Sequence, residues 1–338
     1  DRSPSRGLGD VYKRQTSALA PLLHCQWKAT SGPYGGPVYA LYWQDSLVLA
    51  GGTAGGVFIS RDCGDLWSPV NTTGQRYDVN AIVAVGSVLL TSTGMRSTDL
   101  GSTWSEVVIS KDHRVLDLYA TDRFILAALD MGGILKSLDD GQTWVNSSKG
   151  LPSNEYIGTT VKSFARLGSA LFALTEHGVF QASDDGGYWT LNAAERVSLG
   201  NETVFSYQAV DTSLIVAHTF SEVYSRSAGK ESWKRILKAR GARRLYHLNG
   251  DLHCDLGTGL LRSTNEGSTW IPEESTIRSR INSVLEQRTL RLAATEDGVY
   301  VSKGIDFTWH LSSTGLLNTD VVQPVSYTHL TLPTNREV

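Results

Sequence analysis

Short runs of alternating and of purely apolar residues recur along the chain and predict strands in a fixed order. In one unit, residues 115–119 alternate apolar and polar side chains, residues 124–128 are almost wholly apolar, and residues 133–136 follow a glycine-bearing corner. Alternation is typical of a half-buried strand, and a short apolar run between turns is typical of a buried one. Alternating segments recur at 79–84 and 281–285, and no helical periodicity stands out. The pattern predicts repeated units of short antiparallel strands.

Each unit carries an octapeptide of the form Ser-x-Asp-x-Gly-x-x-Trp, with the best copies at 97–104 and 137–144. The tryptophans that recur at intervals of 37 to 45 residues are Trp27, Trp67, Trp104, Trp144, Trp189, Trp233, Trp270 and Trp309. A four-stranded propeller blade takes about 40–45 residues. The spacing therefore predicts an all-β fold, a β-propeller of about seven four-stranded antiparallel blades, in which the octapeptide turns lie between the third and fourth strands.

The octapeptide has a structural explanation. Its Asp can accept hydrogen bonds from nearby backbone N–H groups, its Gly tolerates positive φ, and its Trp buries a large area between strands. We therefore expect a fold-making turn rather than a catalytic one. The copies match the pattern less well along the chain. The copy that contains Asp184 lacks the leading Ser, and in a later copy Asn265 replaces Asp. The predicted structural residues are Ser60, Asp62, Gly64, Trp67, Ser97, Asp99, Gly101, Trp104, Ser137, Asp139, Gly141, Trp144, Asp184, Gly186, Trp189, Ser263, Asn265, Gly267 and Trp270.

These turns resemble the Asp-box, or BNR, repeat family over residues 27–315. Members of that family include sialidases, xyloglucanases, sortilin-type receptors, photosystem II assembly factors and many secreted bacterial propellers of unknown role. The segment 27–39 is similar to the start of the last group. The resemblance implies a propeller in which Trp27 lies on a separate strand that completes the final blade.

The two ends of the chain read as translated adapter DNA. Residues 10–15 can be encoded as GAT GTG TAT AAG AGA CAG, and residues 325–330 as GTC TCT TAT ACA CAT CTG, which is essentially the reverse complement. That DNA resembles the transposon end used to prepare sequencing libraries. We therefore expect residues 1–15 and 325–338 to be non-native, and 16–324 to be a propeller fragment truncated at both ends.

Composition narrows the class of partner and the compartment. The chain of 338 residues has 31 Lys and Arg against 34 Asp and Glu, a formal net charge of −3, so nucleic acid is not an expected partner. No apolar run approaches the roughly 20 residues of a transmembrane segment. Cys25, Cys63 and Cys254 show neither metal-binding spacing nor a disulfide framework. Residues 17–23 fit the remnant of a signal peptide, which predicts a secreted or periplasmic protein. We also expect the protein to be a monomer.

No catalytic set emerges from the residues. Sialidases of the family that the chain resembles carry an Arg-Ile-Pro motif upstream of the first Asp box, and this chain has none. Carboxylates in the second corner of each unit, which we expect to be solvated turn residues, are Asp130, Glu176, Glu222, Asp255, Glu296 and Asp297. The histidines lack the spacing of a metal site. We predict no catalytic residue, no metal and no cofactor.

One basic cluster spans the fourth strand of a blade and the link to the next, at 234–244. Links between blades share one rim of a propeller, so these charges would gather on one face with those of the following link. The candidate anion-binding residues are Arg240, Arg243, Arg244, Arg278 and Arg280. Acidic residues share the rim, at Asp78, Asp112, Glu155 and Glu202, so ordinary solvated charge is the alternative interpretation.

These features favour a non-enzymatic recognition scaffold that binds a protein or a polysaccharide, either on the face that bears the links or at the mouth of the channel. One alternative is a glycoside hydrolase of the Asp-box superfamily, sialidase- or xyloglucanase-like. Another is a propeller similar to the photosystem assembly factors. Fold alone separates none of these hypotheses, because one fold carries many functions.

Overall fold

The computed structural model describes most of the region between residues 36 and 312. The described ranges are 36–53, 56–70, 77–152, 158–183, 185–192, 206–209, 214–218, 222–227, 233–239, 241–242, 244–248, 250–257, 259–273, 275–287, 289–303 and 308–312. The two predicted adapter segments, 1–15 and 325–338, lie outside these ranges, as do Cys25 and Trp27.

Within the described residues, the strands pair into seven four-stranded antiparallel sheets, each formed in chain order. The first contains β1 (Val38–Gln44), β2 (Leu47–Gly52), β3 (Val57–Ser60) and β4 (Ser68–Val70). The second contains β5 (Ile82–Val85), β6 (Val88–Thr91), β7 (Met95–Ser97) and β8 (Ser105–Glu106). The third contains β9 (Val115–Ala120), β10 (Ile125–Leu129), β11 (Gly133–Ser137) and β12 (Val145–Asn146). The fourth contains β13 (Val161–Leu167), β14 (Ala170–Thr175), β15 (Gly178–Ala182) and β16 (Trp189–Leu191).

The remaining sheets follow the same order. The fifth contains β17 (Ser206–Ala209), β18 (Leu214–His218), β19 (Glu222–Ser227) and β20 (Lys234–Lys238). The sixth contains β21 (Arg244–Leu248), β22 (Asp251–Asp255), β23 (Leu260–Ser263) and β24 (Ile271–Glu273). The seventh contains β25 (Ile281–Gln287), β26 (Leu290–Thr295), β27 (Gly298–Lys303) and β28 (Trp309–Leu311). The all-β prediction of four-stranded antiparallel propeller blades is confirmed.

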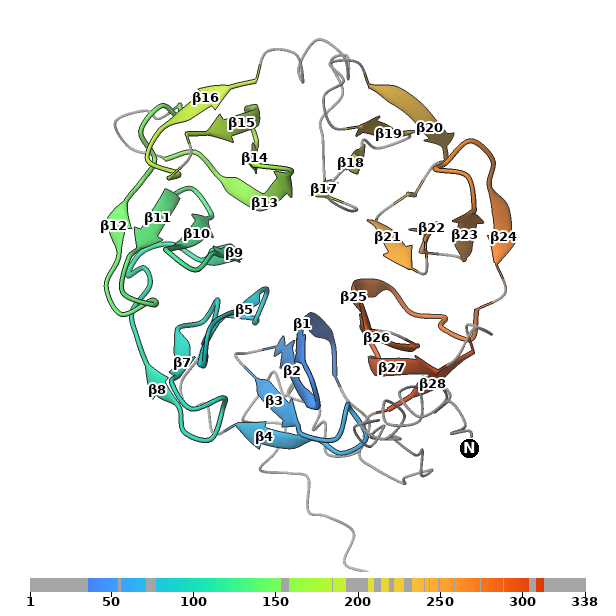
Figure 1. The fold of residues 1–338 in the computed structure, drawn as a ribbon, viewed down its shortest axis with the longest axis horizontal. Coiled ribbons are helices and arrows are strands. Elements are labelled where there is room, and N and C mark those ends of the chain that lie inside the picture. Colours follow the sequence, from blue (N-terminus) through green and yellow to red (C-terminus); the bar gives the residue numbers. More distant parts are fainter. Residues whose placement is uncertain are drawn as a thin grey trace, which may run out of the picture.

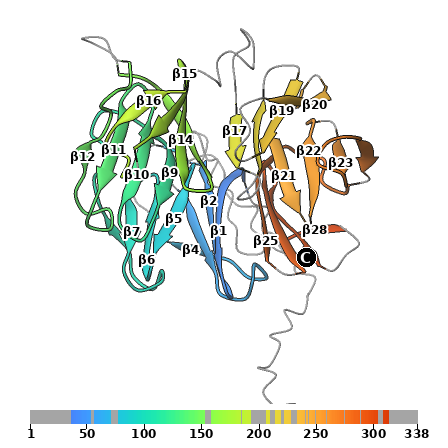
Figure 2. The same ribbon diagram turned by 45° about the horizontal axis from the view of Figure 1, so that its top comes forward.

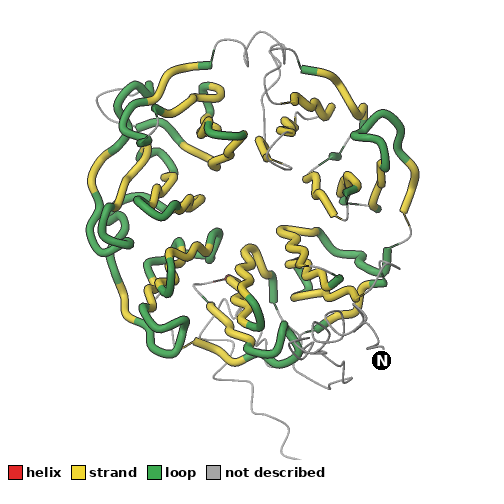
Figure 3. Tube along the Cα trace, in the orientation of Figure 1, coloured by secondary structure: helices red, strands yellow, loops and turns green. Residues whose placement is uncertain are grey.

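The sheets stand around a central axis as the blades of a β-propeller (Figures 1 and 3). The first strand of each blade is innermost and the fourth is outermost (Figure 1), and we identify each blade by its first strand. Because successive strands run in opposite directions, the loop after the first strand and the octapeptide turn share one face of the ring, the turn face. The corners between second and third strands and the links between blades share the other, the link face (Figure 2 shows the blades obliquely).

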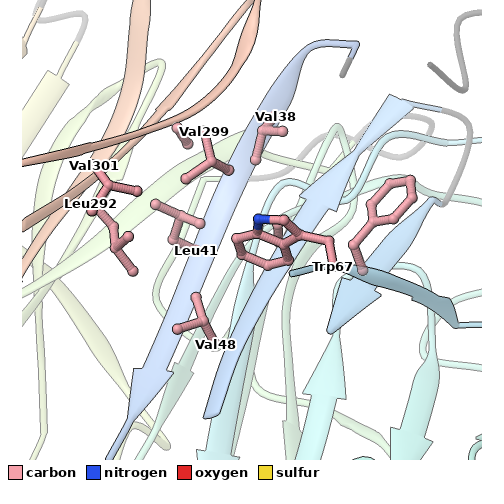
Figure 4. Packing of buried hydrophobic residues seen from close by; sticks show 10 residues of the cluster. Val38, Leu41, Val48, Trp67, Leu292, Val299 and Val301 are labelled. Atoms are coloured by element: carbon pink, nitrogen blue, oxygen red, sulfur yellow. The ribbon is translucent and has the colours of Figure 1, made fainter. Parts of the chain in front are cut away.

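Each blade is apolar on both surfaces and packs between two neighbours. Every residue of β2 and of β10 is buried, as expected for strands that are covered on both sides. The ring closes where the β1 blade meets the β25 blade: Leu41 and Trp67 pack with Leu292, Val299 and Val301 (Figure 4). The β25 blade takes its fourth strand from β28, so this sheet has four strands without a contribution from Trp27.

The octapeptide turn is held by its serine hydroxyl and its carboxylate. In the copy at 97–104, the Ser97 hydroxyl donates to Asp99 Oδ1 at 2.8 Å and accepts the Gly101 N–H at 2.8 Å. Asp99 in turn accepts the backbone N–H of Thr103 at 2.8 Å and its hydroxyl at 2.7 Å. The Trp104 indole N–H closes the turn on the Gly101 carbonyl at 3.1 Å. The copy at 137–144 repeats all of these bonds.

Two copies that depart from the octapeptide pattern are held by similar hydrogen bonds. Asn265 accepts the Thr269 N–H at 2.8 Å, so an amide oxygen replaces the carboxylate without loss of the turn. In the copy before Trp189, the hydrogen bond from Ser183 reaches Asp185 at 3.0 Å. The turn from Ser183 to Trp189 is one residue shorter than the others, and Asp185 therefore holds the role that the sequence suggested for Asp184, which lies outside the described residues.

Basic side chains next to the turns connect neighbouring blades. Arg96 donates to the carbonyl of Asp140 at 2.8 Å, and Lys136 donates to that of Asp185 at 2.5 Å. The Arg61 guanidinium reaches the Leu100 carbonyl at 3.3 Å in the same manner. The turn face is thus a chain of similar contacts from blade to blade, and its polar groups serve the fold.

Glycine at the fifth octapeptide position is required by both conformation and space. Gly101 has a φ of 79°, and an added Cβ would lie 2.7 Å from Ile59 Cδ1. Gly86 also has positive φ, 58°, but a Cβ there would meet nothing within 4 Å. We expect Gly86→Ala to lower the free energy of unfolding by about 1–2 kcal/mol through strain. Gly101→Ala should cost roughly 1–3 kcal/mol more through overpacking. Urea denaturation of the two variants measures the difference, and equal losses would show that the contact with Ile59 relaxes freely.

The turn carboxylates predict a defined loss of stability in acid. The Thr103 backbone N–H, with the Thr103 and Ser97 hydroxyls, lowers the pKa of Asp99 to about 2, and the Thr143 hydroxyl leads a similar effect that lowers the pKa of Asp139 to about 2. Because these pKa values lie below that of an unfolded Asp, their stabilisation is present above about pH 4 and is lost as the pH falls toward 2. We expect the double variant Asp99→Asn, Asp139→Asn to show a flatter melting temperature between pH 4 and pH 2.5 than the parent. Parallel curves would contradict this assignment.

Candidate functional site on the link face

Four innermost strands begin at the link face with the same irregularity. The pairing of β1, β9, β13 and β25 with their second strands shifts by one residue after Val38, Val115, Val161 and Ile281. A β-bulge bends a strand and re-aims the side chains that follow it. The residues that resume the pairing are Ala40, Asp117, Ser163 and Ser283. In the β21 blade the equivalent position is that of Arg244, which pairs with Asp255.

Polar side chains link the β21 and β25 blades at this level. Arg244 Nη1 donates to the carbonyl of Asn282, and the Tyr246 hydroxyl donates to that of Ile281 at 3.0 Å. Asp255 Oδ2 accepts the Ile281 N–H at 3.4 Å. The Asn282 amide continues the chain by donating to Val38 on β1 at 2.8 Å. These polar contacts connect three blades at one place on the link face.

A small cavity of about 50 Å³ opens beside the junction. Its lining includes Asp255, Glu273, Arg278, Ser279 and Ile281. Among the described residues, the buried Ser279 hydroxyl has no hydrogen-bond partner. The volume is about that of one or two water molecules, so the cavity admits the end of a polar group rather than a whole sugar ring.

The structure brings three of the five predicted anion-binding arginines to this junction. Arg244 contacts Asn282, Arg278 lines the cavity, and Arg280 lies 3.9 Å from Glu296, both half-exposed. Arg278 is exposed, and no ion pair joins it to any residue within the described ranges. Arg240 and Arg243 lie outside the described residues.

Charges elsewhere on the rim are neutralised more directly. Arg114 pairs with Asp78 at 3.4 Å and also donates to Asn80 at 3.1 Å. The interpretation of the rim as ordinary solvated charge therefore fits the earlier links better than it fits the β21–β25 junction.

Asp117 on β9 is a functional candidate that the sequence reasoning missed. It accepts the backbone N–H groups of Leu118 at 2.9 Å and of Phe164, on the neighbouring β13, at 2.8 Å. Burial raises its pKa to about 6, against the lowering effects of those two hydrogen bonds and of the Arg244 charge. The available signal was a carboxylate at a position that other innermost strands give to Ala40, Ser163 and Ser283.

Three of the corner carboxylates make polar contacts near the surface, and a fourth is buried. Asp130 and Glu176 converge on Thr160: its hydroxyl lies 3.3 Å from Asp130 Oδ1 and its N–H donates to Glu176 at 3.0 Å. Glu222 pairs with Arg235 at 2.8 Å. The expectation of a solvated turn residue is wrong for Asp255, which is 3% exposed and accepts the Gly257 N–H at 2.6 Å. It is buried because it ends the second strand of its blade rather than lying in the corner.

The buried cysteine and histidine of β22 are not arranged as a nucleophile or a metal site. Burial, with a smaller effect of Asp255, raises the pKa of the Cys254 thiol to about 12, so it is not a thiolate at neutral pH. His253 is buried against Glu273 at 2.8 Å. Across the ranges given above, no group of three or more His, Cys, Asp or Glu side chains could hold a metal ion.

Comparison with known proteins supports the fold. No protein-family profile matches the chain, and no curated protein matches it. Among solved structures, YCF48 bound to a D1 peptide is similar with a TM-score of 0.65 and 17% identity, over 83% of this chain and 97% of that one. The xyloglucanase of family GH74 from Xanthomonas campestris has a TM-score of 0.63 and 12% identity, over 86% of this chain and 56% of the enzyme.

A third similar structure is the extracellular domain of the one-component system BT4673 from B. thetaiotaomicron. Its TM-score is 0.62 with 12% identity, over 80% of this chain and 41% of that one. Likeness at such low identity shows a shared β-propeller fold. In the part of the chain that the structure describes, no helix has the length and apolar character needed to cross a membrane.

The raised pKa of Asp117 generates a prediction with a definite sign. A carboxyl group whose pKa is higher in the folded than in the unfolded state stabilises below the unfolded pKa, and this contribution is lost as the pH rises through about 6. Asp117→Asn removes that dependence. We expect the melting temperature of the variant, relative to the parent, to rise between pH 5 and pH 8. A constant difference would show that Asp117 titrates normally.

Proposed function

We propose that this protein is a non-enzymatic recognition scaffold that binds an acidic segment of a partner protein at the β21–β25 junction of the link face. The observation that carries the proposal is Arg278, exposed without an ion pair in the described ranges and set beside Arg244, Arg280 and a small polar cavity. A guanidinium group binds carboxylates through paired, charge-assisted hydrogen bonds.

A protein partner is favoured over a polysaccharide by the size of the cavity and by the comparisons. A cavity of about 50 Å³ is too small for a sugar ring, and Arg278 in its lining offers a guanidinium group to a carboxylate. The similar structure of YCF48 is one bound to a D1 peptide, and the hypothesis of an assembly-factor-like propeller therefore also predicts a peptide ligand. An acidic polysaccharide remains the alternative ligand, because its carboxylates offer the same contact.

Three further assignments belong to the same proposal. We take the octapeptide turns to be Asp boxes, since the Ser97–Asp99 and Ser137–Asp139 bonds supply a physical reason for the repeat. We take the protein to be a secreted or periplasmic monomer; two of the similar structures are an extracellular domain and a bacterial surface component. We take residues 1–15 and 325–338 to derive from adapter DNA.

A glycoside hydrolase is the second candidate, and one observation favours it. Asp130 and Glu176, from adjacent blades, both contact Thr160, and two carboxylates on one surface are the minimum that glycoside hydrolysis requires. Similar structures include GH74 enzymes, of which this chain spans about half the length.

The proposal predicts that one charge on the link face controls binding of acidic polymers. We expect Arg278→Glu to weaken binding to immobilised poly-L-glutamate at least tenfold, which corresponds to about 1.4 kcal/mol. Arg123→Glu is the matched control, because Arg123 is exposed in the loop after β9, on the turn face. Biolayer interferometry at two salt concentrations measures both, with neutral dextran as the blank.

The outcomes separate the candidates. Equal weakening by both variants would mean non-specific attraction and would contradict the proposal. Preference for polygalacturonate over poly-L-glutamate, lost in Arg278→Glu, would move the ligand to the polysaccharide class. Hydrolysis of xyloglucan that Asp130→Asn abolishes would overturn the non-enzymatic assignment.

A further inference from the structure

Two opposite charges stand at equivalent positions of different innermost strands. Where β1, β13 and β25 carry Ala40, Ser163 and Ser283, β9 carries Asp117 and β21 carries Arg244. Figure 1 shows β9 and β21 on opposite sides of the central axis. The equivalent residues on β1, β13 and β25 are small and uncharged, so Asp117 and Arg244 carry the charges at this level of these five strands.

The carboxylate of Asp117 and the guanidinium of Arg244 are not in direct contact. Within the described residues, no ion pair joins Asp117 to Arg244. The charge of Arg244 nevertheless lowers the pKa of Asp117 against the larger effect of burial. A carboxylate and a guanidinium at the same level of two different blades, without a direct contact, form a dipolar pair that a ligand with both charges can bridge.

Both groups are held in place and both have bonding capacity left. The Asp117 carboxylate uses its oxygens on the N–H groups of Leu118 and Phe164. Since β13 has a sheet partner only on its β14 side, the Phe164 N–H comes from its free inner edge, and Asp117 lies along that edge. Arg244 is exposed and donates one N–H group to Asn282. A carboxylate accepts about four hydrogen bonds and a guanidinium donates five.

We propose that the mouth of the propeller on the link face binds an aliphatic zwitterion, whose carboxylate contacts Arg244 and whose ammonium group contacts Asp117. The inference rests on the proposed role of Arg244 as an anion-binding residue and adds a second, cationic requirement to it. A ligand with only one charge leaves the other protein group without its counter-charge, whereas a ligand with both satisfies the two groups that the fold already holds apart.

The experiment is a ladder of amino acids with increasing charge separation. Glycine, 3-aminopropanoate, 4-aminobutanoate and 6-aminohexanoate are titrated at pH 8, where Asp117 is ionised because its pKa is about 6. Butanoate and butylamine carry one charge each and serve as the matched ligands. Isothermal titration calorimetry, with NMR shifts for weak members, measures the affinities. We expect one member of the ladder to bind at least tenfold more tightly than both single-charge compounds.

Variants assign the two contacts. Asp117→Asn should lower the affinity for the best zwitterion to that for butanoate. Arg244→Gln should lower it to that for butylamine. Arg244→Lys keeps the charge and should retain part of the preference, which keeps the test valid if Arg244→Gln does not fold. Arg123→Glu should leave every affinity unchanged.

Three results would overturn the inference. They are a ladder that binds no more tightly than butanoate, a preference for the zwitterion that survives Asp117→Asn, and a preference equally lost in Arg123→Glu. Failure of the wider proposal has a different signature, because binding of poly-L-glutamate depends on Arg278. Loss of polymer binding with an intact ladder would remove the acidic-segment proposal and leave the zwitterion site.

Discussion

A blade of this protein is a four-stranded sheet with two apolar surfaces, and it is stable only when another blade covers each of them. The wholly buried β2 and β10 show the constraint most directly. Sequence neighbours provide the cover everywhere but at the ends, where Leu41 and Trp67 of one blade meet Leu292 and Val301 of another. Burial of apolar area contributes about 25 cal/mol per Å², so an open ring would leave two such surfaces in water. Closure is therefore the contact on which the position of every other group depends.

The two faces of the ring answer this constraint in different ways. On the turn face, the same bonds recur in successive blades, as Ser97 with Asp99 and Ser137 with Asp139 show, and Arg96 extends them to the next blade. On the link face, the hydrogen bonds differ from blade to blade. Thr160 donates to Asp130 and Glu176, while the Asn282 amide donates to the Val38 carbonyl. Because its bonds repeat, the turn face serves the fold. The link face does not repeat, so individual side chains there can differ from blade to blade and take on a function.

The same difference determines what the sequence predicts. Periodicity placed the first strand at 115–119 within one residue of β9 and the third strand at 133–136 within one residue of β11, because alternation and glycine are local signals. The predicted strand at 79–84 starts later, at Ile82, since Val79 instead donates its N–H to Gly52 of the preceding blade. Local signals likewise found Arg244 and Arg278 as charged link residues. They missed Asp117 because its importance comes from Phe164 and Arg244, which are distant in sequence and are brought near only by the ring.

The groups that the sequence pattern does not explain are also those that cost the fold stability. Asp255 takes a position that other second strands give to Gly51, Ala128, Leu174 or Ala294, and it is 3% exposed. Burying a carboxylate is unfavourable unless hydrogen bonds compensate it, and Asp255 accepts the N–H groups of Gly257 and Ile281, at 2.6 and 3.4 Å. Asp117 bears the same cost, visible in its raised pKa. A repeat that needed only stability would keep small or apolar residues at both positions. Local violations of the pattern that a stable fold tolerates tend to lie at functional sites. Both of these lie on the link face, Asp117 near the start of an innermost strand and Asp255 at the end of a second strand.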